Sequence, residues 1–135
     1  MTSEIVGPLT PTSYDPDFFY SQPFPIPYFD NKELKIGFTE PKHQPYLLHA
    51  DKVLADFLKL NAADRINGSE MVHAYYSEIL ECGYTSALKI NTVKDIWNFV
   101  WPLEIVVEWD TNGDYYLLVS CGCEWEEEHG LQLVF

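Results

Sequence analysis

The pair Asn112-Gly113, placed between two runs of alternating apolar residues, constrains the fold of this chain more than any other feature. Asn-Gly is the strongest short indicator of a β-hairpin, because hairpin turns need positive φ angles that these residues tolerate. A second turn over 126–130 precedes a short apolar segment over 131–135. Residues 104–135 therefore predict a three-stranded antiparallel meander. The inward-facing residues expected on its first two strands are Ile105, Val107, Trp109, Tyr115, Leu117, Val119, Cys121, Cys123 and Trp125.

Prolines alternate with apolar residues near the N-terminus, in the segment Pro23-Phe-Pro-Ile-Pro-Tyr28. Three prolines at a period of two remove N–H donors from one side of a strand only, so the pattern predicts an edge strand that pairs on its other side. A polyproline recognition segment is the alternative, because that conformation also favours proline. After a turn over 30–33, Leu34, Ile36 and Phe38 alternate and predict the partner strand.

The middle of the chain has the apolar spacing of helices, with a repeat every three or four residues. A first helix begins near Pro45, which a first helical turn accepts, and stops at Asn61. A second helix follows the turn at 67–69, and Gly83 ends it. The buried positions expected on these two helices are Leu47, Ala50, Leu54, Phe57, Leu58, Val72, Tyr75, Tyr76 and Ile79.

A third helix is predicted to begin at Thr92, which has the spacing of a reciprocal capping box with Asp95, and to end at Pro102. Strands, then helices, then strands is the order typical of an α+β fold. The chain has 135 residues, the length of one domain. We therefore expect a single domain over 1–135, with an antiparallel sheet of about five strands and three helices packed on one face. The residues expected on the buried face of the third helix are Val93, Ile96, Trp97, Val100 and Trp101.

Charge is the unusual part of the composition. Eight Lys and Arg stand against 21 Asp and Glu, which gives a net charge of −13. Nucleic acids and anionic membranes are bound through clustered cations, so we expect neither as a partner. The start of the chain has neither the basic residues nor the apolar stretch of a signal peptide. The three cysteines, Cys82, Cys121 and Cys123, are an odd number that suits reduced thiols, and these features favour a cytoplasmic location.

Metal binding is the first chemistry that the sequence raises. Cys121 and Cys123 share one face of a predicted strand and His129 follows, but this spacing completes no zinc ligand set. Both cysteines are in register with buried apolar positions, so buried thiols are the preferred interpretation. Two Glu-x-x-His spacings, at 70–73 and 126–129, are typical of di-iron helices, but the second lies in a predicted turn. We expect no metal and no cofactor.

Acidic residues gather on the outward side of the predicted meander. Like charges on neighbouring strands repel, so a fold that keeps them together uses them either for recognition or only for solubility. We take recognition as the hypothesis, because complementary charge steers the approach of a basic partner. The alternative is a small hydrolase or metal-dependent enzyme in which His129 acts with Glu126 or Glu128. The candidate partner-binding residues are Glu104, Glu108, Glu124, Glu126, Glu127, Glu128 and His129.

The ending Cys123-Glu-Trp-Glu-Glu-Glu-His-Gly130 resembles the signature of an uncharacterised family of small bacterial proteins. In that family a strand ends in Cys-Asp/Glu-Trp-x-x-Glu-His-Gly and the chain returns as an apolar strand. An early Gly-x-Leu at 7–9 and the aromatic run at 97–105 also fit. The resemblance implies an immunity-type or accessory protein and brings no catalytic residue with it. We therefore predict a non-enzymatic acidic binding protein that engages a basic protein partner.

Overall fold

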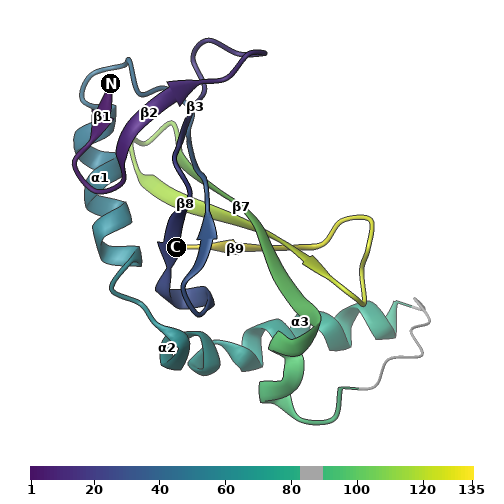
Figure 1. Cartoon of the computed structure of the whole chain (residues 1–135). Helices are drawn as coiled ribbons and strands as arrows, with labels where there is room; N and C mark the ends of the chain where they lie inside the picture. Colours follow the sequence, from purple (N-terminus) through teal and green to yellow (C-terminus); the bar gives the residue numbers. More distant parts are fainter. Residues whose placement is uncertain (83–89) are drawn as a thin grey trace.

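The computed structural model describes residues 1–82 and 90–135 and has a mixed α+β fold (Figure 1). This confirms the fold class predicted from the sequence. Seven strands form the main sheet, in the order β1-β2-β3-β6-β7-β8-β9, so the expected number of about five was too low. The strands are β1 (Thr2–Ser3), β2 (Gly7–Pro11), β3 (Phe19–Ser21), β6 (Ile36–Phe38), β7 (Val100–Trp109), β8 (Tyr115–Cys123) and β9 (Leu131–Val134).

The three C-terminal strands form the predicted antiparallel meander. Trp109 of β7 lies opposite Tyr115 of β8, and Cys121 of β8 lies opposite Leu131 of β9. Gly113 in the β7–β8 loop has a φ of 83°, which is the left-handed conformation that the Asn-Gly pair predicts. The local pattern therefore placed both turns of the meander correctly.

β6 and β7 are parallel neighbours, with Ile36 opposite Ile105 and Phe38 opposite Val107. The sequence predicted only antiparallel pairing, so this pair corrects it. Parallel neighbours need a long crossover connection, and the segment 39–99 between these strands supplies one. That crossover contains the helices. The helical segment therefore lies between β6 and β7 in the sequence, although the two strands are neighbours in the sheet.

The proline-rich segment forms a separate two-stranded ribbon. β4 (Phe24–Ile26) pairs antiparallel with β5 (Lys32–Leu34), and Pro27 opens a single 3₁₀ turn, η1 (Pro27–Phe29). The predicted strand through Tyr28 is therefore shorter than expected, because a proline suits the first turn of a helix as well as an edge strand. The predicted partner strand is divided, because β5 ends at Leu34 and the segment Ile36–Phe38 belongs to the main sheet as β6. The two patterns still identified buried residues, which are Ile26, Tyr28, Leu34, Ile36 and Phe38, whereas Phe24 is half-buried.

Helices follow β6 in the order expected for the first two. An additional short helix starts at Asn61, where the sequence predicted only a stop. The Asn61 side chain accepts from the N–H of Ala63, and the Asp64 carboxylate accepts from the N–H of Asn61, so the two residues form a capping box. The predicted end of the second helix at Gly83 lies outside the described residues. The α-helices are α1 (Tyr46–Phe57), α2 (Ala62–Asn67) and α3 (Ser69–Glu81).

The predicted third helix is wrong. Residues Val93–Phe99 form a 3₁₀ segment, η2, and the chain enters β7 at Val100. Thr92 makes no side-chain cap, and of the expected buried face only Ile96 is buried. The pairing of β7 with β8 starts at Val100 and removes Trp101 from the helix, so that its side chain is 40% exposed. The pairing of β7 with β8, which runs from Val100 to Trp109 with one register shift between Pro102 and Glu104, outweighs one further helical turn.

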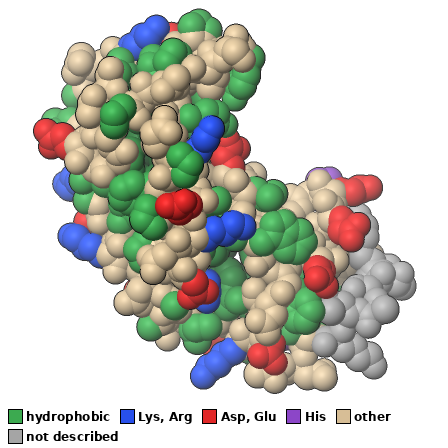
Figure 2. Space-filling model, in the orientation of Figure 1, with side chains coloured by type: hydrophobic (Ala, Val, Ile, Leu, Met, Phe, Trp, Pro, Cys, Tyr) green, Lys and Arg blue, Asp and Glu red, His purple; other side chains and the backbone are tan. Residues whose placement is uncertain are grey.

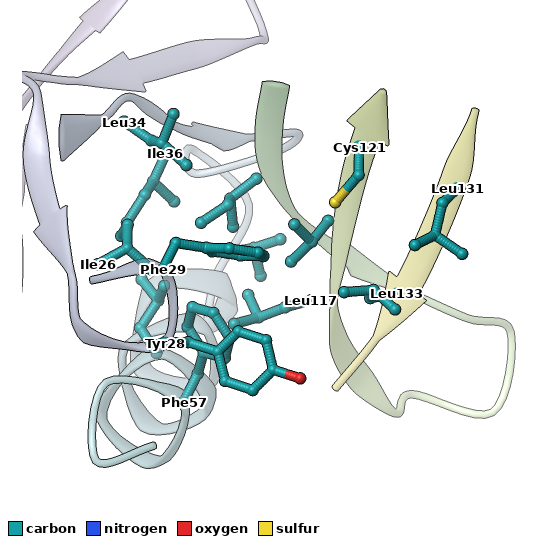
Figure 3. Packing of buried hydrophobic residues seen from close by; sticks show 14 of the residues in the cluster. Ile26, Tyr28, Phe29, Leu34, Ile36, Phe57, Leu117, Cys121, Leu131 and Leu133 are labelled. Atoms are coloured by element: carbon teal, nitrogen blue, oxygen red, sulfur yellow. The ribbon is translucent and has the colours of Figure 1, made fainter. Parts of the chain in front are cut away.

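The core lies between the sheet and the helices. Figure 3 shows Phe57 of α1 and Tyr28 of η1 approaching Leu117 and Leu133 of the sheet. The expected inward residues of β8 are buried, from Leu117 to Cys123, whereas Trp109 at the end of β7 is 37% exposed. Among the helices described, none is both long and apolar enough to cross a bilayer.

Candidate protein-binding site

The β8–β9 turn is held in place by the side chain of Glu126. Its Oε1 accepts from the N–H of Glu128 at 3.2 Å and from the N–H of His129 at 3.3 Å. The carbonyl of Glu126 accepts from the N–H of Gly130 at 3.0 Å. Glu126 is only 8% exposed, which differs from the exposed position that an acidic turn suggests. This carboxylate organises the turn from inside and is not available to a partner.

The other charged residues of the turn point into solvent. Glu124, Glu127, Glu128 and His129 are all exposed, and we call these four residues the acidic turn. Figure 2 shows acidic side chains beside a histidine on this side of the molecule. The scaffold beneath them is well packed, because Trp125 is buried against the rings of Tyr75 and Tyr76. The turn therefore presents negative charge from a fixed backbone.

Glu104 and Glu108 are not part of the acidic turn. They lie on the outer face of β7, opposite Ser120 and Tyr116 of β8. A strand rises about 3.4 Å per residue, so this register sets the two positions about 14 Å and about 27 Å along β8 from Glu124. The candidate partner-binding residues predicted from the sequence therefore divide into two groups, one in the β8–β9 turn and one on the outer face of β7.

The local environments of the two β7 carboxylates are unlike those of freely solvated groups. Glu104 Oε1 accepts from the hydroxyl of Tyr20 at 2.6 Å, and this hydrogen bond is the main cause that raises the pKa of Tyr20. Partial burial raises the pKa of Glu108. Glu104 thus ties β7 to β3 across the outer face, which is a structural role.

An apolar pocket of about 420 Å³ lies next to the acidic turn, between α3 and β9. Tyr75 connects its two walls, because its hydroxyl donates to the carbonyl of Gly130 at 2.9 Å. Burial, with the charges of Cys123, Glu126 and Glu78 adding to it, raises the pKa of Tyr75, so the phenol remains a donor near neutral pH. The pocket is lined by Met71, Val72, Tyr75, His129, Gly130, Leu131, Gln132 and Leu133.

Sequence reasoning missed this pocket. Met71 is 69% exposed and belongs to none of the apolar patterns, whereas Tyr75 was assigned to the core. The spacing of Tyr75 on α3 and the ending at 129–130 are both visible in the sequence. Nothing in the sequence shows that residues about fifty positions apart face each other across a groove.

The arrangement around His129 bears on the alternative enzymatic interpretation. His129 Nδ1 lies 3.3 Å from Glu126 Oε1, but that oxygen already accepts two backbone N–H groups, and the histidine side chain is 74% exposed. The carboxylates of Glu126 and Glu128 do not line the pocket that His129 borders. A general base normally faces an enclosed space that substrate can share with its carboxylate partner, and this geometry lacks that arrangement.

The residues considered as metal ligands are dispersed. Cys121 and Cys123 are buried on the inner face of β8, and burial raises the pKa of Cys121 to about 12, which keeps its thiol protonated. His73 Nε2 lies 3.0 Å from the carbonyl oxygen of Ile90. Within residues 1–82 and 90–135, no three His, Cys, Asp or Glu side chains are grouped so that they could hold a metal ion.

The fold and site together define a small α+β domain with an acidic turn beside an apolar groove. The chain belongs to the family described as a domain of unknown function, DUF6985, which matches residues 6–135. The comparison with curated proteins found no match, and no solved structure matches the chain.

Proposed function

We propose that this chain is a non-enzymatic binding protein that engages a basic segment of a partner protein through the acidic turn. The observation that carries the proposal is the role of Glu126, whose buried carboxylate accepts from the backbone N–H groups of Glu128 and His129 and so holds the backbone from which the exposed carboxylates project. A surface that is rigid before binding loses little conformational entropy when a partner docks. Negative charge on such a surface raises the rate of association with a basic partner.

An immunity-type role is the particular form of this proposal. Such a protein binds and blocks a toxin, and the resemblance of residues 123–130 to a signature of that kind of family supports it. The net charge of −13 supports a basic partner, because two strongly acidic proteins repel each other. The bacterial origin and cytoplasmic location that the sequence suggested are part of the same proposal.

The proposal is tested with a displayed library of random peptides, selected on the wild-type chain in low salt. We expect enrichment of Lys and Arg. The variant Glu124→Gln/Glu127→Gln/Glu128→Gln should lose that enrichment, because it removes the exposed carboxylates and leaves Glu126 in place. The matched control Glu4→Gln/Glu33→Gln/Glu40→Gln changes the net charge equally at exposed positions elsewhere and should select the same basic peptides.

Two results would contradict the proposal. One is selection without any enrichment of basic residues. The other is equal enrichment on both triple variants, which would mean that net charge attracts the peptides and that the acidic turn is not the binding surface. Selection in about 1 M salt, where the Debye length is about 3 Å, should abolish the enrichment.

A further inference from the structure

We infer that the basic partner binds as an extended strand, which adds to the free edge of β9 and places alternate side chains in the groove beneath α3. This inference rests on the proposed protein-binding function and specifies its mode of contact. Strand addition obtains affinity from main-chain hydrogen bonds and specificity from pockets for alternate side chains. The molecule has both a free strand edge and a pocket at β9.

The register of β9 shows which backbone groups are free. Leu117 and Phe135 exchange both N–H···O bonds, each at 3.0 Å. Hydrogen-bonded and non-hydrogen-bonded pairs alternate along an antiparallel ladder, so Leu131 and Leu133 bond toward β8. The N–H and C=O groups of Gln132 and Val134 then point away from β8. Within the described part of the chain, β9 pairs with β8 alone, so these groups lie on a free edge.

The free edge carries no blocking residue. Natural sheets blunt their free edges with lysine, proline or a bulge, or by keeping the edge strand very short, and β9 has four residues. β9 consists of Leu-Gln-Leu-Val, which contains none of these residues, and its ladder with β8 continues without a register shift. Val134 is 64% exposed beside the free groups. An edge of this kind is a ready template for another strand.

The groove provides a site for side chains at the start of the edge. The pocket beside α3 is lined by consecutive residues 129–133 and by no residue of β8, so it opens on the free side of β9. A second apolar pocket, of about 410 Å³, lies near the other end of β9, but Tyr115 of β8 lines it together with Phe57 and Phe135, so it belongs to the inner face of the sheet and not to the free edge.

Charge identifies the class of partner. Glu127 and Glu128 are exposed in the turn before β9. In the groove, the negative charge of Glu78 is close enough to Tyr75 to add to the rise of its pKa. Among the described residues, neither pocket is lined by lysine or arginine. Two copies of a chain of charge −13 repel, which argues against edge-to-edge pairing of this protein with itself. The features favour a segment in which apolar residues alternate with lysine or arginine.

The test uses the full chain and an acetylated peptide of alternating valine and lysine as probe. Val134→Pro removes one free N–H without disturbing the ladder to β8, because that N–H points outward. We expect it to weaken peptide binding at least tenfold. The matched control Val134→Thr keeps the N–H and a β-branched side chain, and it should bind within about twofold of the wild type.

A second arm does not depend on the folding of a variant. The same peptide, N-methylated at alternate backbone amides, keeps its charge and side chains but cannot pair along one edge, and we expect it to bind at least tenfold more weakly. On binding of the unmodified peptide, amide hydrogen exchange at Gln132 and Val134 should slow at least tenfold. Leu131 and Leu133, which already donate to β8, should change little.

The outcomes separate this inference from the proposed function. Strand addition is overturned if the affinity of the peptide falls in the acidic-turn variant but is unchanged by both Val134→Pro and N-methylation. In that case the acidic binding function stands. If this peptide does not bind the wild type although the library selects basic peptides, the strand inference alone is overturned. If the selected basic peptides bind the acidic-turn variant and the wild type equally well, the proposed function and the strand inference are both overturned. If sedimentation shows that the chain alone forms a dimer that Val134→Pro dissociates, the edge belongs to a second copy and the basic partner is overturned.

Discussion

Individual residues on β8 and in the turn that follows it have roles that their chemical type alone does not indicate. Glu126 is one of several consecutive glutamates, yet it alone turns inward and accepts backbone N–H groups. Cys121 and Cys123 look like metal ligands in the sequence, but they are buried among apolar residues of β8. At this scale, burial decides whether a polar group serves the fold or a partner.

Glu126→Ala should destabilise the protein by about 1–2 kcal/mol, because the N–H groups of Glu128 and His129 lose their acceptor in hydrogen bonds that are partly buried. Glu126→Gln keeps an acceptor oxygen and should cost less. Glu127→Ala, on an exposed side chain in the same turn, should stay within about 0.5 kcal/mol of the wild type. Urea unfolding measures all three. Equal stability of the two alanine variants would show that Glu126 does not anchor the turn.

Cys121 gives a prediction for alkaline pH. Its thiol has a pKa of about 12 in the folded protein, whereas an unfolded cysteine has a pKa of about 8.5. The folded state therefore keeps its proton longer, so the contribution of this thiol is fully present below about pH 8.5 and is lost as the pH rises toward 12. The loss can reach about 1.4 kcal/mol per pH unit for one group.

The measurement is the free energy of unfolding between about pH 8 and 9, where unfolded tyrosines, with a pKa of about 10, are still mostly protonated. Cys121→Val removes this thiol and should make the decline with pH shallower, while the part that comes from Cys123, whose pKa burial also raises, should remain. Cys82→Ser alters an exposed cysteine and should leave the slope of the wild type unchanged. A slope in Cys121→Val as steep as that of the wild type would rule out this thiol as the source.

At the scale of elements, short sequence patterns predicted a strand or turn correctly where residues a few positions apart determine it. The alternation over 104–135 and the Asn112-Gly113 pair located β7, β8 and β9, because turn residues and period-two burial act over a few positions. The parallel pairing of β6 with β7 joins segments more than sixty residues apart, and no local pattern encodes it. The predicted third helix failed because the spacing of Trp97 and Trp101 fits a helix, while Trp101 belongs to a strand.

The same limit applies to the site. The exposed charges of the acidic turn could be read from the run of glutamates, because a turn rich in carboxylates is normally solvated. The inward position of Glu126 depends on the turn geometry around Gly130, and the groove depends on how α3 packs across from β9. Such packing is fixed by tertiary contacts, so only the structure reveals it.

Trp101 and Gly122 form an element-scale unit on the outer face of the sheet. The indole ring of Trp101 on β7 lies where a Cβ at position 122 of β8 would be, so Gly122→Ala should displace the ring and cost about 1 kcal/mol. In a Trp101→Ala background the same change should be neutral or slightly stabilising, since alanine restricts the unfolded chain more than glycine does. Additive effects in this double-mutant cycle would show that the ring does not cover the glycine.

At the scale of the whole molecule, the position of β9 explains why the acidic turn and the apolar groove lie next to each other. In the part of the chain that the structure describes, the sheet ends at β9, α3 and β9 line one pocket, and exposed glutamates lie in the turn that begins the strand. Under the proposed function, the net charge of −13 disfavours contact with other copies of the chain and with nucleic acid and attracts a basic chain. The account therefore places recognition at one edge of the molecule.

The rate constant for association of a selected basic peptide with the wild type, measured by stopped-flow fluorescence at several salt concentrations, tests this central claim most directly. The account predicts that the rate falls steeply between about 10 mM and about 1 M salt, as the Debye length shortens from about 30 Å to about 3 Å. In low salt, Glu124→Gln/Glu127→Gln/Glu128→Gln should slow association by about tenfold or more, and Glu4→Gln/Glu33→Gln/Glu40→Gln by much less. Equal association rates for the wild type and the acidic-turn variant in low salt would contradict it.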